Sequence, residues 1–251
     1  MIAAVRSELR KLLTVRSTYV TVGFSLLFVV FMSFYVEGVR NGMTVQMLPT
    51  AFAEVATNAA TPTGVLAAII AILLLTHEYR YNTITYTLTA SRSRTKVLLA
   101  KMAVLSVFAV LYVVLMSLVA VVALYVGAVV VKGITPMHQE IAVLNLLWRI
   151  AFYGWAYAMI GLLYAALIRN QVGAFVSFLL TPAVAEPLLG LLLKSNHIYL
   201  PFTALQQVLT REAPQLGEDA LTNGSAAIVV LIYIAVGGLI AWLLFLRRDA
   251  N

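Results

Sequence analysis

Long uncharged apolar runs dominate this sequence, separated by short polar segments that carry most of the charges. A helix that spans a membrane needs about 20 apolar residues, because each residue adds about 1.5 Å and the hydrocarbon core is about 30 Å thick. The pattern therefore predicts an all-α, polytopic membrane protein with six transmembrane helices in a single domain over residues 1–251. The expected spans are approximately 17–36, 62–77, 102–131, 150–168, 172–193 and 226–246.

Local signals refine the ends of these spans. Thr61 can N-cap the second span, and Pro62 suits the first position of a helix. Trp148 and Arg149 precede the fourth span and predict an anchor at the membrane interface. Two prolines and one carboxylate interrupt the fifth span and predict a broken or re-entrant segment: Pro182, Glu186 and Pro187.

The composition excludes a soluble protein. Hydrophobic residues make up 62% of the chain and charged residues 11%, whereas a soluble domain carries about 25% charged residues. The 17 basic and 10 acidic side chains are too few to cover the surface of a soluble globule or to form a disordered tail.

The basic side chains are distributed unevenly among the segments that join the spans. If the N-terminus is cytoplasmic, 12 of the 17 Lys and Arg residues fall on the cytoplasmic side. Because cytoplasmic segments are enriched in these residues, we expect both termini in the cytoplasm of a bacterial cell, with the spans in its cytoplasmic membrane. The net charge of +7 thus indicates orientation and not nucleic-acid binding.

The N-terminal segment has apolar residues on one helical face and charged residues on the other. This pattern predicts an amphipathic helix in the membrane interface, with its cations facing anionic lipid. The alternative is a plain basic flank of the first span. The apolar face comprises Ile2, Val5, Leu9, Leu12 and Leu13, and the charged face Arg6, Glu8, Arg10 and Lys11.

The segment 78–101 is the longest and most basic of the expected cytoplasmic segments. Its Tyr, Ile and Leu content is high for a solvated connector, so it is expected either to pack against a partner or to remain a solvated loop. It carries the pattern Glu78-x-Arg80-x-x-Thr83, then Leu88, a turn, a Ser/Arg cluster, and Lys101 opening a long helix.

This pattern resembles the ABC-2 type transporter permeases, as do the N-terminal segment 7–17 and the segment 199–202 before the last span. The resemblance implies that the 78–101 segment and the N-terminal helix rest on a separate ABC ATPase subunit and transmit its closure. It also implies two ATPase copies, which bind ATP and Mg, and a second permease subunit, identical or homologous. The positions assigned to coupling are Glu8, Lys11, Glu78, Arg80, Thr83, Tyr86, Leu88, Arg92, Arg94 and Lys101.

No nucleotide-binding domain is expected on this chain. A P-loop requires Gly-Lys before Ser or Thr, and none of the five lysines follows a glycine. The chain is therefore predicted not to be an enzyme and to hold no cofactor itself. It has no cysteine, and its three histidines lie far apart in sequence, so no metal site is expected.

The fourth span carries small residues at steps of three and four, which form one face. Such a face lets helices approach closely in lipid. It predicts packing within one subunit, with a dimer seam or part of a translocation path as alternatives. The residues are Ala151, Gly154, Ala158, Gly161 and Ala165.

Glu186 lies deep in the fifth span, where a carboxylate is costly unless it is paired or hydrated. An ion pair with Lys194 or Arg149, or exposure at the outer surface, is one interpretation, and a role in substrate binding or gating is the other. Pro201 begins a short outer helix with an apolar side, which the resemblance implies to be an external helix at the extracellular gate and which is otherwise a plain surface helix. The candidate outer gate comprises Pro182, Glu186, Pro187 and Pro201.

Together these features favour the permease subunit of an ATP-driven ABC exporter, which forms the path for a hydrophobic or amphipathic substrate such as a drug, antibiotic, peptide or lipid. Multidrug efflux is one such activity. An ion-coupled secondary transporter is the alternative, but such carriers usually show several buried ionisable groups. A membrane enzyme is disfavoured because no catalytic motif such as Gly-x-Ser-x-Gly is present.

Overall fold

The computed structural model describes residues 2–40, 48–81, 94–133, 142–210 and 220–247. These residues form helices and no strands. The α-helices are α1 (Ile2–Thr14), α2 (Arg16–Val30), α3 (Leu48–Arg80), α5 (Arg94–Tyr125), α6 (Val143–Ile168), α7 (Gln171–Leu180), α8 (Glu186–Leu193), α9 (Pro201–Leu209) and α10 (Asn223–Arg247). Three π-helical segments, η1 (Phe31–Arg40), η3 (Val126–Val131) and η4 (Thr181–Ala185), and one 3₁₀ segment, η5 (Lys194–Tyr199), extend or join them.

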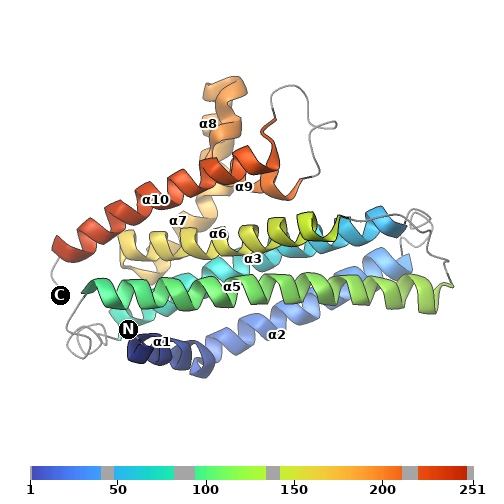
Figure 1. The fold of residues 1–251 in the computed structure, drawn as a ribbon, viewed down its shortest axis with the longest axis horizontal. Helices are drawn as coiled ribbons and strands as arrows, with labels where there is room; N and C mark the ends of the chain where they lie inside the picture. Colours follow the sequence, from blue (N-terminus) through green and yellow to red (C-terminus); the bar gives the residue numbers. More distant parts are fainter. Residues whose placement is uncertain (1, 41–47, 82–93, 134–141, 211–219, 248–251) are drawn as a thin grey trace.

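Six helical stretches within the described residues are long and apolar enough to cross a membrane, which confirms the expected number of spans. Three of them combine an α-helix with a π-helical segment: α2 with η1, α5 with η3, and α7 with η4 and α8. Figure 1 shows α2, α3, α5 and α6 side by side along the long axis, with α1 and the end of α10 at the same end of the bundle.

The second span begins earlier than predicted. Thr61 and Pro62 lie inside α3 and do not start it, because helical structure already begins at Leu48. The hydroxyl of Thr61 donates to the carbonyl of Thr57 one turn back, so it caps nothing. Pro62 lacks an N–H and removes one backbone hydrogen bond, which membrane helices tolerate when neighbouring helices pack around them.

The fifth span is helical without a break from Gln171 to Leu193, so the predicted break at its prolines is wrong. After Leu193 the chain turns back through η5, which brings the amide of Phe202 to Glu186. Between Pro182 and Pro187 the backbone forms a π-helical turn, in which the amide of Glu186 donates to the carbonyl of Thr181. The prolines therefore widen the helix by one turn without ending it. Figure 1 shows α7 and α8 running steeply away from the other spans. Only 11% of the most apolar stretch of this span is buried inside the protein.

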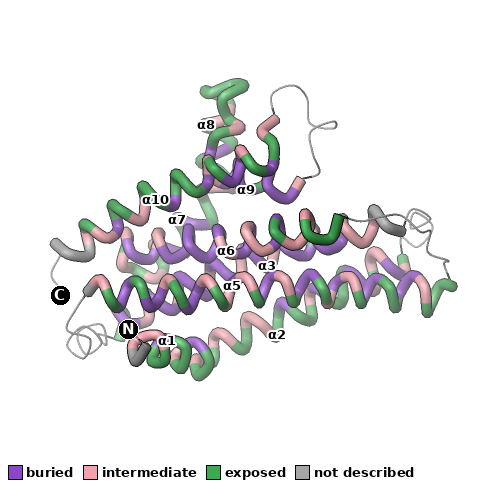
Figure 2. The backbone as a smooth tube through the Cα atoms, in the orientation of Figure 1, coloured by how far each residue is buried: buried purple, intermediate pink, exposed green. Residues whose placement is uncertain are grey.

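The core lies between α3, α5 and α6. A Cβ added at Gly161 would lie 2.5 Å from the carbonyl oxygen of Ala68 in α3, and one at Gly154 would lie 2.6 Å from a methyl group of Val113 in α5. The small-residue face of the fourth span is thus occupied within this chain. Figure 2 shows buried residues along α3 and α6, whereas most residues of α2, α8 and α10 are exposed or half-buried.

Candidate functional site

Four charged side chains meet at the end of the bundle that holds α1. The ammonium of Lys101 in α5 lies 2.6 Å from Glu8 of α1 and 2.6 Å from Glu78 of α3. Lys11 of α1 lies 2.8 Å from Glu8 and 2.6 Å from Glu78. Each cation therefore contacts both carboxylates, and the ring is formally neutral. We call Glu8, Lys11, Glu78 and Lys101 the ion cluster.

The ion cluster is largely withdrawn from solvent. Lys101 is fully buried, and Glu8 and Glu78 are 2% and 5% exposed. The cost of removing such charges from water is recovered only when they are paired with good geometry, so each member depends on the other three. Burial by itself lowers the pKa of Lys11, but its hydrogen bonds and attraction to Glu78 and Glu8 outweigh this and raise the pKa above its ordinary 10.5.

The sequence of α1 explains how the cluster is assembled. Glu8, Lys11 and Leu12 are spaced by three and four residues and so share one helical face. Leu12 is 1% exposed and joins the main hydrophobic core. The predicted faces need a correction: Glu8 faces inward with Leu12, whereas Leu9 and Leu13 are 44% and 52% exposed. Charge pairing at Glu8 therefore turns α1 away from the orientation that its apolar stripe alone suggests.

The structure places the remaining coupling residues in different positions. Arg80 lies outside the ion cluster: its guanidinium donates to Gln171 (3.3 Å) and lies 5.7 Å from the ring centre of Tyr81. Arg94 begins α5, and its side chain is not described. Outside the described residues lie Thr83, Tyr86, Leu88 and Arg92.

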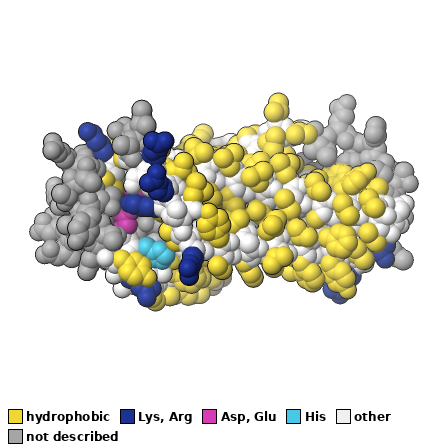
Figure 3. Space-filling model, turned by 90° about the horizontal axis from the view of Figure 1, so that it is seen from below, with side chains coloured by type: hydrophobic (Ala, Val, Ile, Leu, Met, Phe, Trp, Pro, Cys, Tyr) yellow, Lys and Arg dark blue, Asp and Glu magenta, His cyan; other side chains and the backbone are white. Residues whose placement is uncertain are grey.

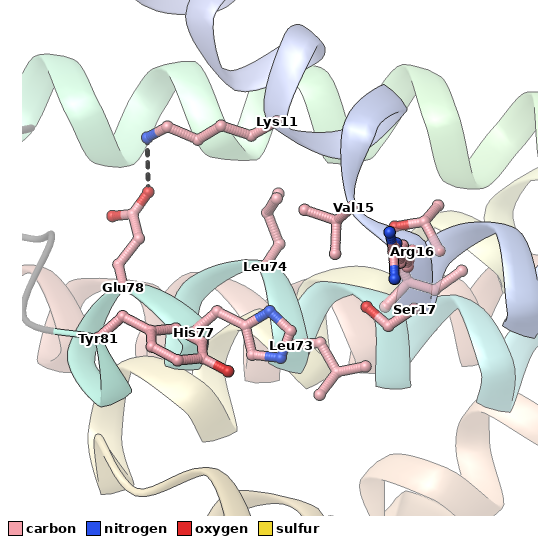
Figure 4. Close-up of a pocket in the computed structure, with 11 residues that line it drawn as sticks. Lys11, Val15, Arg16, Ser17, Leu73, Leu74, His77, Glu78 and Tyr81 are labelled. Atoms are coloured by element: carbon pink, nitrogen blue, oxygen red, sulfur yellow. Dashed lines mark hydrogen bonds and ion pairs between the residues drawn. The ribbon is translucent and has the colours of Figure 1, made fainter.

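A cavity of about 650 Å³ lies beside the ion cluster, between the α1–α2 elbow and α3. We call it the elbow cavity. In Figure 4, the Lys11–Glu78 pair lies at one end and Arg16 and Ser17 lie at the other, with Leu73 and Leu74 of α3 nearby. No local sequence pattern indicates this cavity, because its walls come from segments more than fifty residues apart.

Glu186 is 5% exposed and makes no ion pair with a described residue, so the expected ion pair or outer-surface exposure is wrong. Instead of an ion pair with Lys194 or Arg149, its carboxylate accepts hydrogen bonds from the amides of Phe202 (2.7 Å) and Thr203 (2.8 Å). It also accepts one from the hydroxyl of Thr203 at 2.8 Å. These amides open α9, so a carboxylate from the fifth span caps that helix from outside, where helices attract negative charge.

Arg149 occupies the other end of α9. Its Nε donates to the carbonyl of Val208 at 2.9 Å, and Nη2 donates to the carbonyls of Leu209 and Thr210. Arg149 is 7% exposed, so it is a buried C-terminal cap and not the interfacial anchor expected with Trp148. Trp148 is 40% exposed and donates to Asn145 within α6.

The structure confirms a short helix that starts at Pro201 and buries its apolar side. Under α9, the ring of Phe202 lies 5.7 Å from that of Tyr157 and 5.8 Å from that of Phe178. With a cap at each end and an aromatic layer beneath it, α9 is fixed to α6, α7 and α8. Among the described residues, no three His, Asp or Glu side chains gather to hold a metal.

The fold and these clusters define a multi-pass helical membrane protein. A sequence profile of the ABC-2 family transporter proteins matches residues 4–185, more than half of the chain, so the chain belongs to the ABC-2 transporter family. Members are membrane components of transporters that are not themselves catalytic and generally work with an ATPase subunit. The match includes the ion cluster and ends just before Glu186. No curated protein matches the sequence.

Proposed function

We propose that this chain is the permease subunit of an ATP-driven exporter, and that the ion cluster carries force from an ATPase subunit into the spans. The supporting observation is that one buried charge ring joins α1, the end of α3 and the start of α5. The segment 82–93, which contains Tyr86 and Leu88, connects α3 to α5 at this same end. In this proposal, movement of either α1 or the 82–93 segment is transmitted through the ion cluster to both α3 and α5.

In this proposal the end with the ion cluster faces the bacterial cytoplasm, as the distribution of Lys and Arg favours. Two ATPase subunits bind ATP and Mg below it, and α1 lies in the interface with Leu9 and Leu13 toward lipid. A second permease, identical or homologous, completes the path. The exposed apolar faces of α2, α7, α8 and α10 offer the surface for that partner and for lipid.

At the opposite end, α9 with Glu186, Pro182, Pro187 and Pro201 acts as the outer gate. Its aromatic underside suits a hydrophobic or amphipathic cargo. An ion-coupled carrier is less well supported, because both oxygens of Glu186, the carboxylate deep in the fifth span, already accept hydrogen bonds from α9.

Co-purification tests this proposal. The tagged chain, extracted from its native membranes, is expected to bring down an ATPase with Walker motifs, whose activity copurifies. The double variant Tyr86→Asp/Leu88→Asp is expected to insert into the membrane but to lose this partner. Lys132→Asp, just after η3 at the opposite end of the third span, serves as the control and is expected to retain it. Substrate movement by the purified chain alone, driven by a proton gradient in liposomes, would overturn the proposal.

A further inference from the structure

The elbow cavity has the size and lining of a ligand site. Its volume of about 650 Å³ falls in the range of pockets that hold small molecules, about 300–1,000 Å³. One wall is apolar and comes from Leu73 and Leu74 of α3, and the other comes from the polar residues around the start of α2. Figure 3 shows this end of the molecule from below, with the basic side chains beside a broad apolar surface.

The charge in the cavity favours an anion. The Lys11 charge is balanced within the neutral ion cluster, whereas Arg16 makes no ion pair with any described residue. Arg16 also begins α2, and Val15 before it provides no side-chain cap for the first amides. The guanidinium, these amides and the hydroxyl of Ser17 therefore lie together, and each of these groups is a donor that phosphate oxygens accept.

A second, independent observation concerns Glu78. This carboxylate lines the cavity and is 5% exposed, yet its Oε2 accepts no hydrogen bond from the described residues. A buried acceptor without a donor is costly, and native structures rarely leave one unmatched. Glu78 can therefore accept a hydrogen bond from a donor, and Arg16 can hold an anion.

A phospholipid headgroup with hydroxyl groups beyond its phosphate supplies both the anion for Arg16 and the donor for Glu78. Its phosphodiester carries one negative charge for Arg16, and its hydroxyl can donate to Glu78. The acyl chains then have an apolar surface to follow, because Val20, Phe24 and Leu27 of α2 are 70%, 60% and 73% exposed. A soluble phosphate would use none of this surface.

We propose that the elbow cavity is a binding site for an anionic glycerophospholipid, with the phosphate held at Arg16 and the start of α2, and a headgroup hydroxyl donating to Glu78. The lipid bridges the α1–α2 elbow and the end of α3. This site does not depend on the proposed transport function, since it requires only that this end of the bundle meets a lipid leaflet.

The test is native mass spectrometry of the purified full chain in detergent, titrated with phosphatidylglycerol or phosphatidylcholine of matched acyl chains. Phosphatidylglycerol is expected to bind first and more tightly. Arg16→Gln is expected to weaken its binding about fivefold, the effect of one basic residue on anionic lipid. Arg10→Gln is the matched control, because Arg10 is exposed on α1 and outside the cavity lining.

Two further arms make the result decisive. Ser17→Trp fills the cavity without removing a charge and is expected to reduce binding of phosphatidylglycerol as well. Glycerol 3-phosphate at millimolar concentration is expected not to displace the lipid. Equal binding of the two lipids, or equal losses in Arg16→Gln and Arg10→Gln, would overturn the site. Displacement by glycerol 3-phosphate would show a soluble phosphate ligand and equally overturn the lipid assignment.

Discussion

Lys101 illustrates how one residue in this protein depends on distant parts of the chain. Its stem lies in a long apolar helix, and among the described residues Glu8 and Glu78 are the carboxylates that pair with its ammonium. In sequence it resembles the other basic residues near the third span. Its burial follows from two carboxylates that are 93 and 23 residues away, which no local pattern reveals.

Replacing Lys101 by Met should therefore destabilise the fold strongly. The change leaves two buried carboxylates with only Lys11, and breaking a buried charge network typically costs about 3–5 kcal/mol. Thermal unfolding in detergent, followed by circular dichroism, should show a large drop in Tm. Lys132→Met, at an exposed position just after η3, should change Tm little. Similar shifts for the two variants would contradict the role assigned to the ion cluster.

The ion pairs that Lys11 makes in the ion cluster should stabilise the fold equally over the whole physiological pH range. Since its pKa is raised above 10.5, the stabilisation is complete below that value and is lost as the pH rises through the higher folded pKa. Spin labels at Ser7→Cys and Leu99→Cys can report the α1–α5 distance, because the chain has no native cysteine. The distance distribution should broaden only above about pH 10.5. Broadening between pH 7 and 9 would refute this.

At the scale of whole elements, apolar runs predicted the six spans well, because the hydrocarbon thickness fixes their length. The apolar runs did not predict correctly where these helices begin and end. The Ala-rich stretch before Pro62 continues α3 outward, and its polar Thr57 and Thr61 satisfy their hydroxyls on the helix backbone. Glu186 and Arg149 were predicted from local context, but each satisfies an end of α9, a contact set by tertiary packing.

Removing the cap at Glu186 should loosen α9 specifically. In Glu186→Ala the amides of Phe202 and Thr203 lose their acceptor, and loss of a helix N-cap costs about 0.5–2 kcal/mol. Hydrogen–deuterium exchange should accelerate across α9 while the amides of α3 and α6 remain protected. Glu54→Ala, at an exposed position in α3, should leave exchange in α9 unchanged. If both variants behave alike, the cap contributes nothing.

The crossing of α6 and α3 gives a second prediction at this scale. Gly161→Ala places a methyl group 2.5 Å from the Ala68 carbonyl, and such overpacking costs about 1–3 kcal/mol. Gly238 of α10 has open space around it, so Gly238→Ala should be neutral or stabilise by up to about 1 kcal/mol. Measured in the same detergent, the melting temperature of Gly161→Ala should therefore fall. That of Gly238→Ala should stay unchanged or rise.

At the scale of the whole molecule, the proposed orientation can be read directly from labelling. A membrane-impermeant thiol reagent should modify Lys132→Cys in intact cells and Arg10→Cys only after the membrane is permeabilised, since positive charge concentrates on the cytoplasmic side. The native chain, which has no cysteine, provides the background. Labelling of Arg10→Cys in intact cells would invert the orientation and move the ion cluster away from any cytoplasmic ATPase.

The charge ring also sets an order for biogenesis. Glu8 leaves the ribosome 93 residues before Lys101, which at about 5–20 residues per second is a delay of about 5–20 s. Until then the first helix has no complete set of counter-charges and cannot take its final place. The N-terminal helix α1 is therefore among the first parts to be synthesised, but it reaches its final position only after Lys101 of α5 has been made.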